Sequence, residues 1–230
     1  AASMASGIIE YLGDGSWTKR LHAGWAAQCG LRAAAIGGAG FFGPRAAIEG
    51  IHGLYKAFAP SITPDYNALT GELGERWEAA RVAFKPYACG TMTQPFIDCA
   101  VRLAKHDIDF DTVESITCLV GEGTVHRLWE PLADKQQPPT PYAAKFSGPY
   151  TVAAGLRFGD AGLAEFTPAA IADERLRAIS AKVDYRVDPN NEYPVNYTGD
   201  VVIKLRDGTE LHEHQGQLRG GMRERMSHAE

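Results

Sequence analysis

A hairpin signature near residue 207 constrains the fold more than any other feature of the chain. Val201–Leu205 alternates apolar and polar side chains, which is typical of a strand with one buried face. Asp207 and Gly208 follow as a two-residue hairpin signal, and Thr209–His214 has the pattern of the returning strand. The chain therefore contains an antiparallel pair of strands.

Helical and strand patterns alternate irregularly before this hairpin. Helices are predicted over residues 22–39, 45–58, 91–106, 143–158 and 168–181, and strands over 77–84, 111–120 and 183–187. Thr167 and Pro168 suit the N-cap and the first position of the last of these helices. Gln136–Pro141 is rich in proline and predicts a rigid extended linker. Because no regular βαβ repeat is present, the predicted fold class is α+β.

Composition restricts the class of partner and the compartment. The chain has 230 residues, 45% of them hydrophobic and 22% charged, and a net charge of −5. This balance argues against a nucleic-acid partner, and no apolar run has the length of a membrane span. The N-terminus has no signal-peptide pattern, and the four cysteines show no disulfide spacing. We therefore expect a cytoplasmic protein with reduced thiols and no membrane partner.

A cluster of basic side chains stands out on this acidic chain. Lys19, Arg20 and His22 lie within four residues, directly before an Ala/Gly-rich helical pattern. Such a cluster, with the positive end of a helix beside it, suits a small anion. The alternative is an ordinary group of solvated side chains at a helix start.

The same run begins a series of motifs that resembles one family. The motifs are G-S-x-T-K-R-L-H-A-G-W-A-A over residues 15–27, G-F-F-G-P over 40–44, E-G over 49–50, F-K-P-Y-A-C over 84–89, A-K-F-S-G-P-Y over 144–150, D-G over 207–208 and R-G over 219–220. Together they resemble the MmgE/PrpD family, which includes 2-methylcitrate dehydratase, cis-aconitate decarboxylase and iminodisuccinate epimerase.

The resemblance implies a division into domains. Members of this family combine a helical domain with an α+β lid domain. We therefore expect residues 1–43 to be the remnant of the helical domain, 44–216 the lid-type domain, and 217–230 a segment returning to the helical domain. Family members are also about twice this long, and the S-x-x-E capping box at 227–230 is typical of a helix start. The chain is thus expected to be the C-terminal part of such an enzyme, or one chain of a split one.

The resemblance also implies which side chains carry the chemistry. The family's reactions develop charge on carboxylate oxygens, which positioned cations stabilise. By resemblance, the catalytic residues are Lys19, His22, Lys85 and Tyr150. Lys19 is expected to contact a substrate carboxylate, His22 to assist or orient, and the Tyr150 phenol to shuttle a proton or hold an oxyanion.

Three further side chains are expected to bind substrate, and two positions depart from the family pattern. Arg20, Lys145 and Ser147 lie beside the catalytic residues in the sequence.

Ala88 replaces a proline of the family motif, and Gln94 stands where many members carry a histidine. The second departure removes an acid/base group. We expect Lys19, His22, Lys85 and Tyr150 to converge on one cleft between the helical remnant and the α+β domain.

Other chemistries have weaker support in the sequence. The S-x-x-K run at 16–19 lacks the companion motifs of penicillin-recognising enzymes. Cys89, Cys99 and Cys118 have no C-x-x-C spacing suited to an iron–sulfur cluster. His212 and His214 share one face of a predicted strand, where a zinc site is one interpretation and an exposed edge strand the preferred one. No metal and no cofactor are expected.

Two functions from different classes follow from these observations. The first, which the resemblance implies, is a cofactor-independent lyase, a dehydratase of the 2-methylcitrate type that acts on a small di- or tricarboxylate in propionate catabolism. A decarboxylase or epimerase of the same family is the alternative. The second is a non-catalytic truncated or accessory subunit. In both cases we expect a homodimer, or a companion chain that supplies the missing helical half.

Overall fold

The computed structural model describes residues 1–14 and 16–229. Contacts divide the chain into two compact units, Ala1–Trp77 and Glu78–Glu230. This division falls later than the predicted border between residues 43 and 44. The expected domains 1–43, 44–216 and 217–230 stay a prediction, and each unit is described here by itself.

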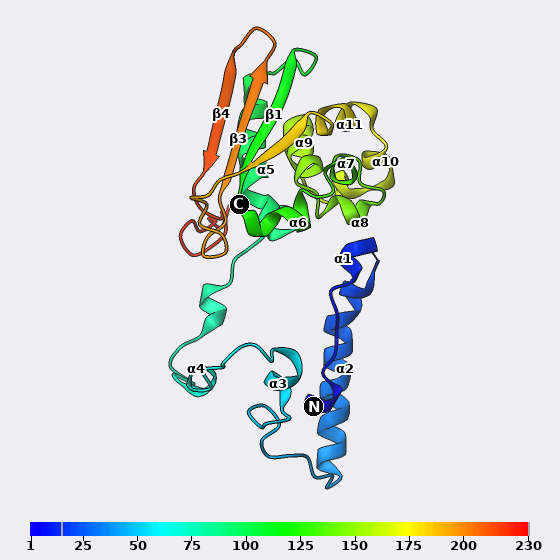
Figure 1. The fold of residues 1–230 in the computed structure, drawn as a ribbon, viewed down its shortest axis with the longest axis vertical. Coiled ribbons are helices and arrows are strands. Elements are labelled where there is room, and N and C mark those ends of the chain that lie inside the picture. Colours follow the sequence, from blue (N-terminus) through cyan, green and yellow to red (C-terminus); the bar gives the residue numbers. More distant parts are fainter. Residues whose placement is uncertain (15, 230) are drawn as a thin grey trace. The chain divides into compact units, whose positions relative to one another are not determined.

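The first unit is built on one long helix. Helix α2 (Thr18–Gly38) is the predicted Ala/Gly-rich helix, begun four residues early, and the other helices of the unit are short (Figure 1). They are a 3-10 turn (Ala2–Met4), α1 (Tyr11–Asp14), α3 (Leu54–Phe58) and α4 (Asn67–Thr70). The predicted helix 45–58 is wrong except for α3. Gly50 and Gly53 interrupt it with tight turns, in which Gly53 N donates to Gly50 O at 2.7 Å.

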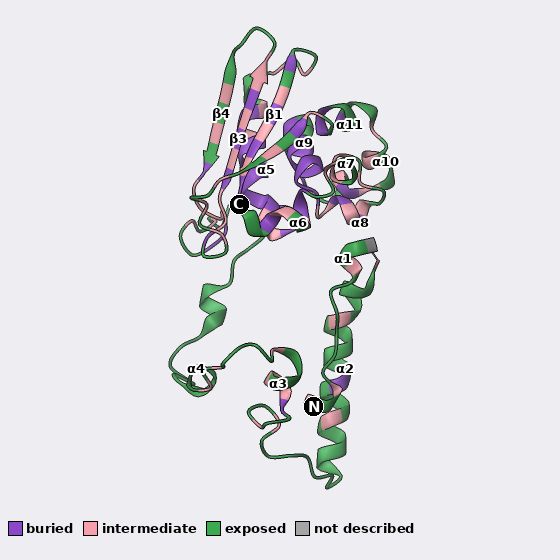
Figure 2. Ribbon diagram, in the orientation of Figure 1, coloured by how far each residue is buried: buried purple, intermediate pink, exposed green. Residues whose placement is uncertain are grey.

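Helix α2 is far more exposed than its composition predicts. Its many small residues suggested close packing against other helices over most of its surface. Instead Cys29 is its one buried residue, and Figure 2 shows the helix largely exposed. That expectation is wrong for this chain, because the other described helices of the unit have only three to five residues each.

The second unit contains a four-stranded mixed sheet in the order β2-β1-β3-β4. The strands are β1 (Val113–Val120), β2 (Val183–Val187), β3 (Gly199–Leu205) and β4 (Glu210–Gln215). Strand β1 pairs in parallel with β2 and antiparallel with β3, and β3 and β4 form the predicted hairpin. The predicted strands at 111–120, 183–187, 201–205 and 209–214 are confirmed.

Two helices pack against this sheet, and a third packs against one of them. Helix α5 (Gln94–Leu103) packs on β3 and β4, while α9 (Gly148–Phe158) packs on α5, β2 and α11 (Glu174–Ser180). The close approach of α5 and α9 needs Gly155, since a Cβ there would lie 2.8 Å from the Ala100 Cβ. Buried residues gather in α5, α9 and the inner strands (Figure 2).

The remaining helices of this unit are short. They are α6 (Val125–Leu128), α7 (Leu132–Gln136), α8 (Pro141–Ala144), α10 (Pro168–Ile171) and 3-10 turns at Glu78–Arg81, Thr91–Thr93, Ala104–His106, Glu122–Thr124 and Ala164–Phe166. The predicted strand 77–84 is therefore wrong, since it contains a 3-10 turn.

Capping side chains divide two of the predicted helices. Ser147 caps α9 and separates it from α8, and Asp173 caps α11 through a 2.6 Å bond from Leu176 N. Thr167 caps α10 through Ala170 N, as predicted. With helices and a mixed sheet in one unit, the fold class is α+β, as predicted. None of the described helices is both long and apolar enough to span a bilayer.

Candidate functional site

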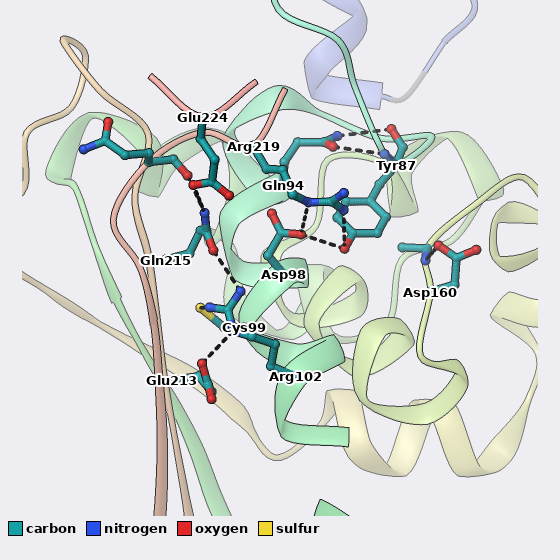
Figure 3. A network of polar contacts seen from close by, with 12 residues as sticks. Tyr87, Gln94, Asp98, Cys99, Arg102, Asp160, Glu213, Gln215, Arg219 and Glu224 are labelled. Carbon is teal, nitrogen blue, oxygen red and sulfur yellow. Dashed lines mark hydrogen bonds and ion pairs between the residues drawn. The ribbon is translucent and has the colours of Figure 1, made fainter. Parts of the chain in front are cut away.

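The segment before helix α5 presents Lys85. We call residues 84–90 the Lys85 loop. Lys85 is exposed, and its ammonium donates to Cys89 O at 3.2 Å. Gln94, at the start of α5, holds the loop backbone, because its amide accepts from Tyr87 N and donates to Tyr87 O, both at 3.1 Å (Figure 3). Gln94, which stands where many family members carry a histidine, thus fixes the backbone at Tyr87.

A second lysine reaches the same loop from the segment before α9. The Lys145 ammonium donates to Ala88 O at 2.5 Å and lies 4.4 Å from the ring centroid of Phe166. Gly90 N donates in return to Lys145 O at 2.9 Å. Lys85 and Lys145 therefore bring their ammonium groups to neighbouring carbonyls, of Cys89 and Ala88. Two like charges held this close favour a bound anion between or beside them.

The thiol at the centre of this loop is not a nucleophile at neutral pH. Burial raises the pKa of Cys89 to about 11, although the Thr93 hydroxyl and the charges of Lys85 and Lys145 lower it. Its Sγ lies 3.1 Å from Thr93 Oγ1. Since the thiolate is the reactive form, Cys89 packs as a small apolar group.

Tyr150 and Ser147 lie at the start of α9. Ser147 is fully buried; its hydroxyl accepts from Tyr150 N at 2.9 Å and donates to Lys135 O. The Tyr150 hydroxyl donates to Glu165 O at 2.5 Å, and its ring lies 5.9 Å from that of Phe166. Burial, with nearby Glu165, raises the pKa of Tyr150, so its phenol stays protonated. Phe166 thus neighbours both the Lys145 ammonium and the Tyr150 ring.

The Lys85 loop is also held by Asp98, which the sequence analysis did not single out, and by Arg219 of the R-G motif. The Tyr87 hydroxyl donates to Asp98 Oδ1 at 2.8 Å, and Arg219 donates to the same oxygen at 2.8 Å (Figure 3). One signal was available in the sequence. Gln94, Asp98 and Arg102 follow one another at helical spacing of four, which predicts a polar stripe on α5.

The polar stripe of α5 continues toward the sheet. Arg102 donates to Glu213 Oε2 at 2.7 Å and to Gln215 Oε1 at 2.8 Å (Figure 3). Gln215 then donates to Glu224 Oε2 at 2.8 Å. Helix α5 is thereby joined to strand β4 and to the segment after it.

The basic cluster of the first unit lies in the first turns of α2. Because the helix begins at Thr18, Lys19 and His22 share a face, as expected for a helical run. The Arg20 guanidinium lies 4.8 Å from the Trp17 ring, and the His22 ring packs edge-on against Tyr11 with centroids 5.9 Å apart. Gly15, the first residue of the motif, lies outside the described residues, as does Glu230 of the predicted capping box.

His212 and His214 both face Asp200 on the neighbouring strand. The His212 Nε2 lies 3.1 Å and the His214 Nδ1 3.2 Å from its carboxylate. Strand β4 is an edge strand, as preferred in the sequence-based interpretation. Within residues 1–14 and 16–229, no three side chains form a metal-binding group.

Neither of the two cavities described here is lined by a predicted site residue. One of about 570 Å³ lies in the first unit, lined mainly by small residues of 2–5 and 44–58. Another of about 250 Å³ borders the Lys85 loop, between residues 79–84 and 220–226, and Phe84 and Arg225 are among its lining residues. The second cavity thus reaches Phe84, the residue before Lys85, whereas Lys85 itself is not among its lining residues.

Family comparison accounts for both units. The MmgE/PrpD C-terminal domain matches residues 87–230, and the MmgE/PrpD N-terminal domain matches residues 1–67. The chain belongs to the MmgE/PrpD family. A comparison with curated proteins found no match. The N-terminal MmgE/PrpD match contains Lys19, Arg20 and His22, and the C-terminal match contains Lys145, Ser147 and Tyr150. Lys85 lies two residues before the C-terminal match begins.

Proposed function

We propose that this chain is a cofactor-independent lyase of the MmgE/PrpD type, a dehydratase of a small di- or tricarboxylate such as 2-methylcitrate. Family membership supports a lyase of this broad class. The observation that carries the proposal is the pair of ammonium groups, Lys85 and Lys145, at adjacent carbonyls of one loop. A polycarboxylate matches that charge.

In the proposed dehydration, a C–H bond next to a carboxylate breaks, a carbon–carbon double bond forms, and the hydroxyl group leaves as water with a proton. Negative charge accumulates on the carboxylate as the proton departs. Lys85 is proposed to stabilise that charge, with Lys145 binding another carboxylate. Arg20 keeps its proposed substrate-binding role on the family resemblance. Lys19 and His22 keep their proposed catalytic roles on the family resemblance.

Tyr150 is proposed to act as a neutral donor. Its raised pKa keeps the hydrogen on the phenol, so it can donate to an oxyanion if the hydroxyl turns from Glu165 O to the substrate. Ser147 contributes by fixing the start of the helix that carries Tyr150. Its predicted contact with substrate stays a prediction.

The test is an assay of the purified full chain against a panel of hydroxylated di- and tricarboxylates, with alkene formation read by absorbance and mass spectrometry. We expect Lys85→Ala to lower turnover about 100-fold, since a positioned charge opposite developing charge contributes several kcal/mol. Lys105→Ala, an exposed lysine of the same unit, is the matched control and should be unaffected. Equal activity of the two variants would overturn the role of Lys85.

The panel also separates the family's alternatives. Release of carbon dioxide would indicate a decarboxylase, and inversion without loss of mass an epimerase. The competing proposal is an accessory subunit without activity of its own. It predicts no turnover by the chain alone and a second polypeptide in the purified material, detectable by intact mass.

A further inference from the structure

Asp98 and Arg219 form a largely buried ion pair that joins helix α5 to the segment after strand β4. The Arg219 Nε lies 2.8 Å from Asp98 Oδ1, and the two side chains are 24% and 5% exposed. In the described part of the chain, the other carboxylate oxygen of Asp98 is buried and has no hydrogen-bond partner. Arg219 is thus its nearby compensating charge.

Both members of this ion pair form hydrogen bonds with the phenol of Tyr87. The Tyr87 hydroxyl donates to Asp98 Oδ1 at 2.8 Å and accepts from Arg219 Nη2 at 3.1 Å. The Arg219 guanidinium also lies 5.4 Å from the Tyr87 ring centroid. The ring of Tyr87 is therefore fixed by a carboxylate and a cation at once (Figure 3).

The same segment holds the other side of the Lys85 loop. Phe84 N donates to Gly220 O at 2.9 Å, directly after Arg219 in the chain. Gly220 has φ +83°, and a Cβ at this position would lie 2.4 Å from Phe84 O, so the approach of the two backbones requires glycine. Hydrogen bonds therefore fix the chain on both sides of Lys85, at Phe84 before it and at Tyr87 after it.

We propose that Asp98 and Arg219 are a positioning pair that acts through Tyr87 to fix the Lys85 loop and the place of the Lys85 ammonium. The catalytic meaning of this placement rests on the proposed function. The placement of the Lys85 ammonium is independent of the proposed function. Neither Asp98 nor Arg219 needs to touch the substrate for this role.

The first test is hydrogen exchange of the full chain without substrate. Tyr87→Phe keeps the ring and removes the hydroxyl that joins the loop to the pair. We expect the peptide covering 84–94 to exchange about tenfold faster, the effect of losing a hydrogen bond to a charged group. Tyr185→Phe is the matched control, because its hydroxyl also donates to a carboxylate, that of Glu130, at 2.6 Å. It should leave 84–94 unchanged.

Two results would overturn the proposal. One is unchanged exchange of 84–94 in Tyr87→Phe. The other is equal acceleration in the 148–158 peptide of helix α9, which would indicate general loosening. If Tyr87→Phe folds poorly, Asp98→Asn provides the second variant. It keeps the side-chain shape and should accelerate exchange in both 84–94 and the segment around Arg219.

The second test is kinetic. With an active substrate from the panel, Tyr87→Phe should lower kcat about tenfold and change KM less than about twofold, since misplaced groups cost rate even when binding persists. Adding Tyr87→Phe to Lys85→Ala should cost nothing further, whereas additive losses would contradict action through Lys85. If the panel shows no turnover, the proposed function fails while the exchange result still decides the placement.

Discussion

At the scale of single residues, the Lys85 loop combines opposing electrostatic effects. Burial raises the pKa of Cys89, whereas Lys85 and Lys145 lower it, and burial is the larger effect. Lys85 and Lys145 therefore bring two cations to the loop while its thiol stays neutral and packed. An anion bound there would meet ammonium groups rather than a nucleophile.

The cysteines should be unreactive in the folded chain. All four thiols are buried, and burial raises the pKa of Cys89 to about 11 and that of Cys99 to about 12. At pH 7.5 we expect iodoacetamide to modify the native chain at least about tenfold more slowly than the urea-unfolded chain. Intact mass over time measures this. Rapid addition of one label to native protein would show that one thiol is accessible and ionised.

At the scale of elements, capping decides where the helices of the second unit begin. Ser147→Ala leaves both Tyr150 N and Lys135 O without their buried partner. We expect it to lower the free energy of unfolding by about 2 kcal/mol, measured by urea titration. Thr167→Ala, at the half-exposed cap of α10, should cost about 1 kcal/mol or less. Equal losses would contradict the buried capping role of Ser147.

Helix crossing in the second unit depends on Gly155. In Gly155→Ala the new Cβ would lie 2.8 Å from the Ala100 Cβ, and we expect a loss of about 1–3 kcal/mol as α5 and α9 separate. Gly30→Ala is the matched control. It lies inside α2, where a Cβ meets nothing within 4 Å, so it should raise stability by about 0.5–1 kcal/mol. Circular dichroism during urea titration distinguishes the two, and a neutral Gly155→Ala would contradict the close crossing.

The elements also show what the sequence could predict. Alternating β3, the Asp207-Gly208 turn and the Thr167 cap were predictable, because each rests on short-range periodicity or local hydrogen bonding. The break of 45–58 into turns was not recognised, although Gly50 and Gly53 were visible. At the site, the family motif indicated Lys85, Lys145 and Tyr150. The Asp98–Arg219 pair joins residues 121 positions apart, and only the fold brings them together.

At the scale of the whole molecule, buried acidic protons make folding sensitive to alkaline pH. The pKa values of Cys89, Cys99 and Cys118 are raised above the usual thiol range by burial. The folded state therefore keeps protons that the unfolded state loses. The stabilising contribution is complete below about pH 9 and is lost as pH rises through about 11 to 12.

We accordingly expect the free energy of unfolding, measured by urea titration, to fall between pH 8.5 and pH 11, by roughly 1 kcal/mol or more for Cys89 and for Cys99. Cys99→Ala should reduce the slope of that fall, since one raised pKa is removed. A free energy of unfolding independent of pH over this range, or an unchanged slope in Cys99→Ala, would contradict the burial of these thiols.

The first unit exposes large apolar side chains, including Leu31 at 76%, Phe42 at 95% and Ile51 at 83%. Surfaces of this kind favour association. We propose a homodimer or a complex with a companion chain. Light scattering at micromolar concentration should therefore give at least twice the chain mass, whereas a clean monomer would contradict the proposal.

The distance along the chain between Tyr87 and Arg219, 132 positions, has a consequence for the order of folding. Contacts between such remote residues form late, because a long loop must first be closed. During synthesis, α5, α9 and all four strands leave the ribosome before residue 219 does. A nascent chain at that point can assemble its core while the Lys85 loop still lacks its contacts with Arg219 and Gly220, so the full affinity for a polycarboxylate should arise only after compaction.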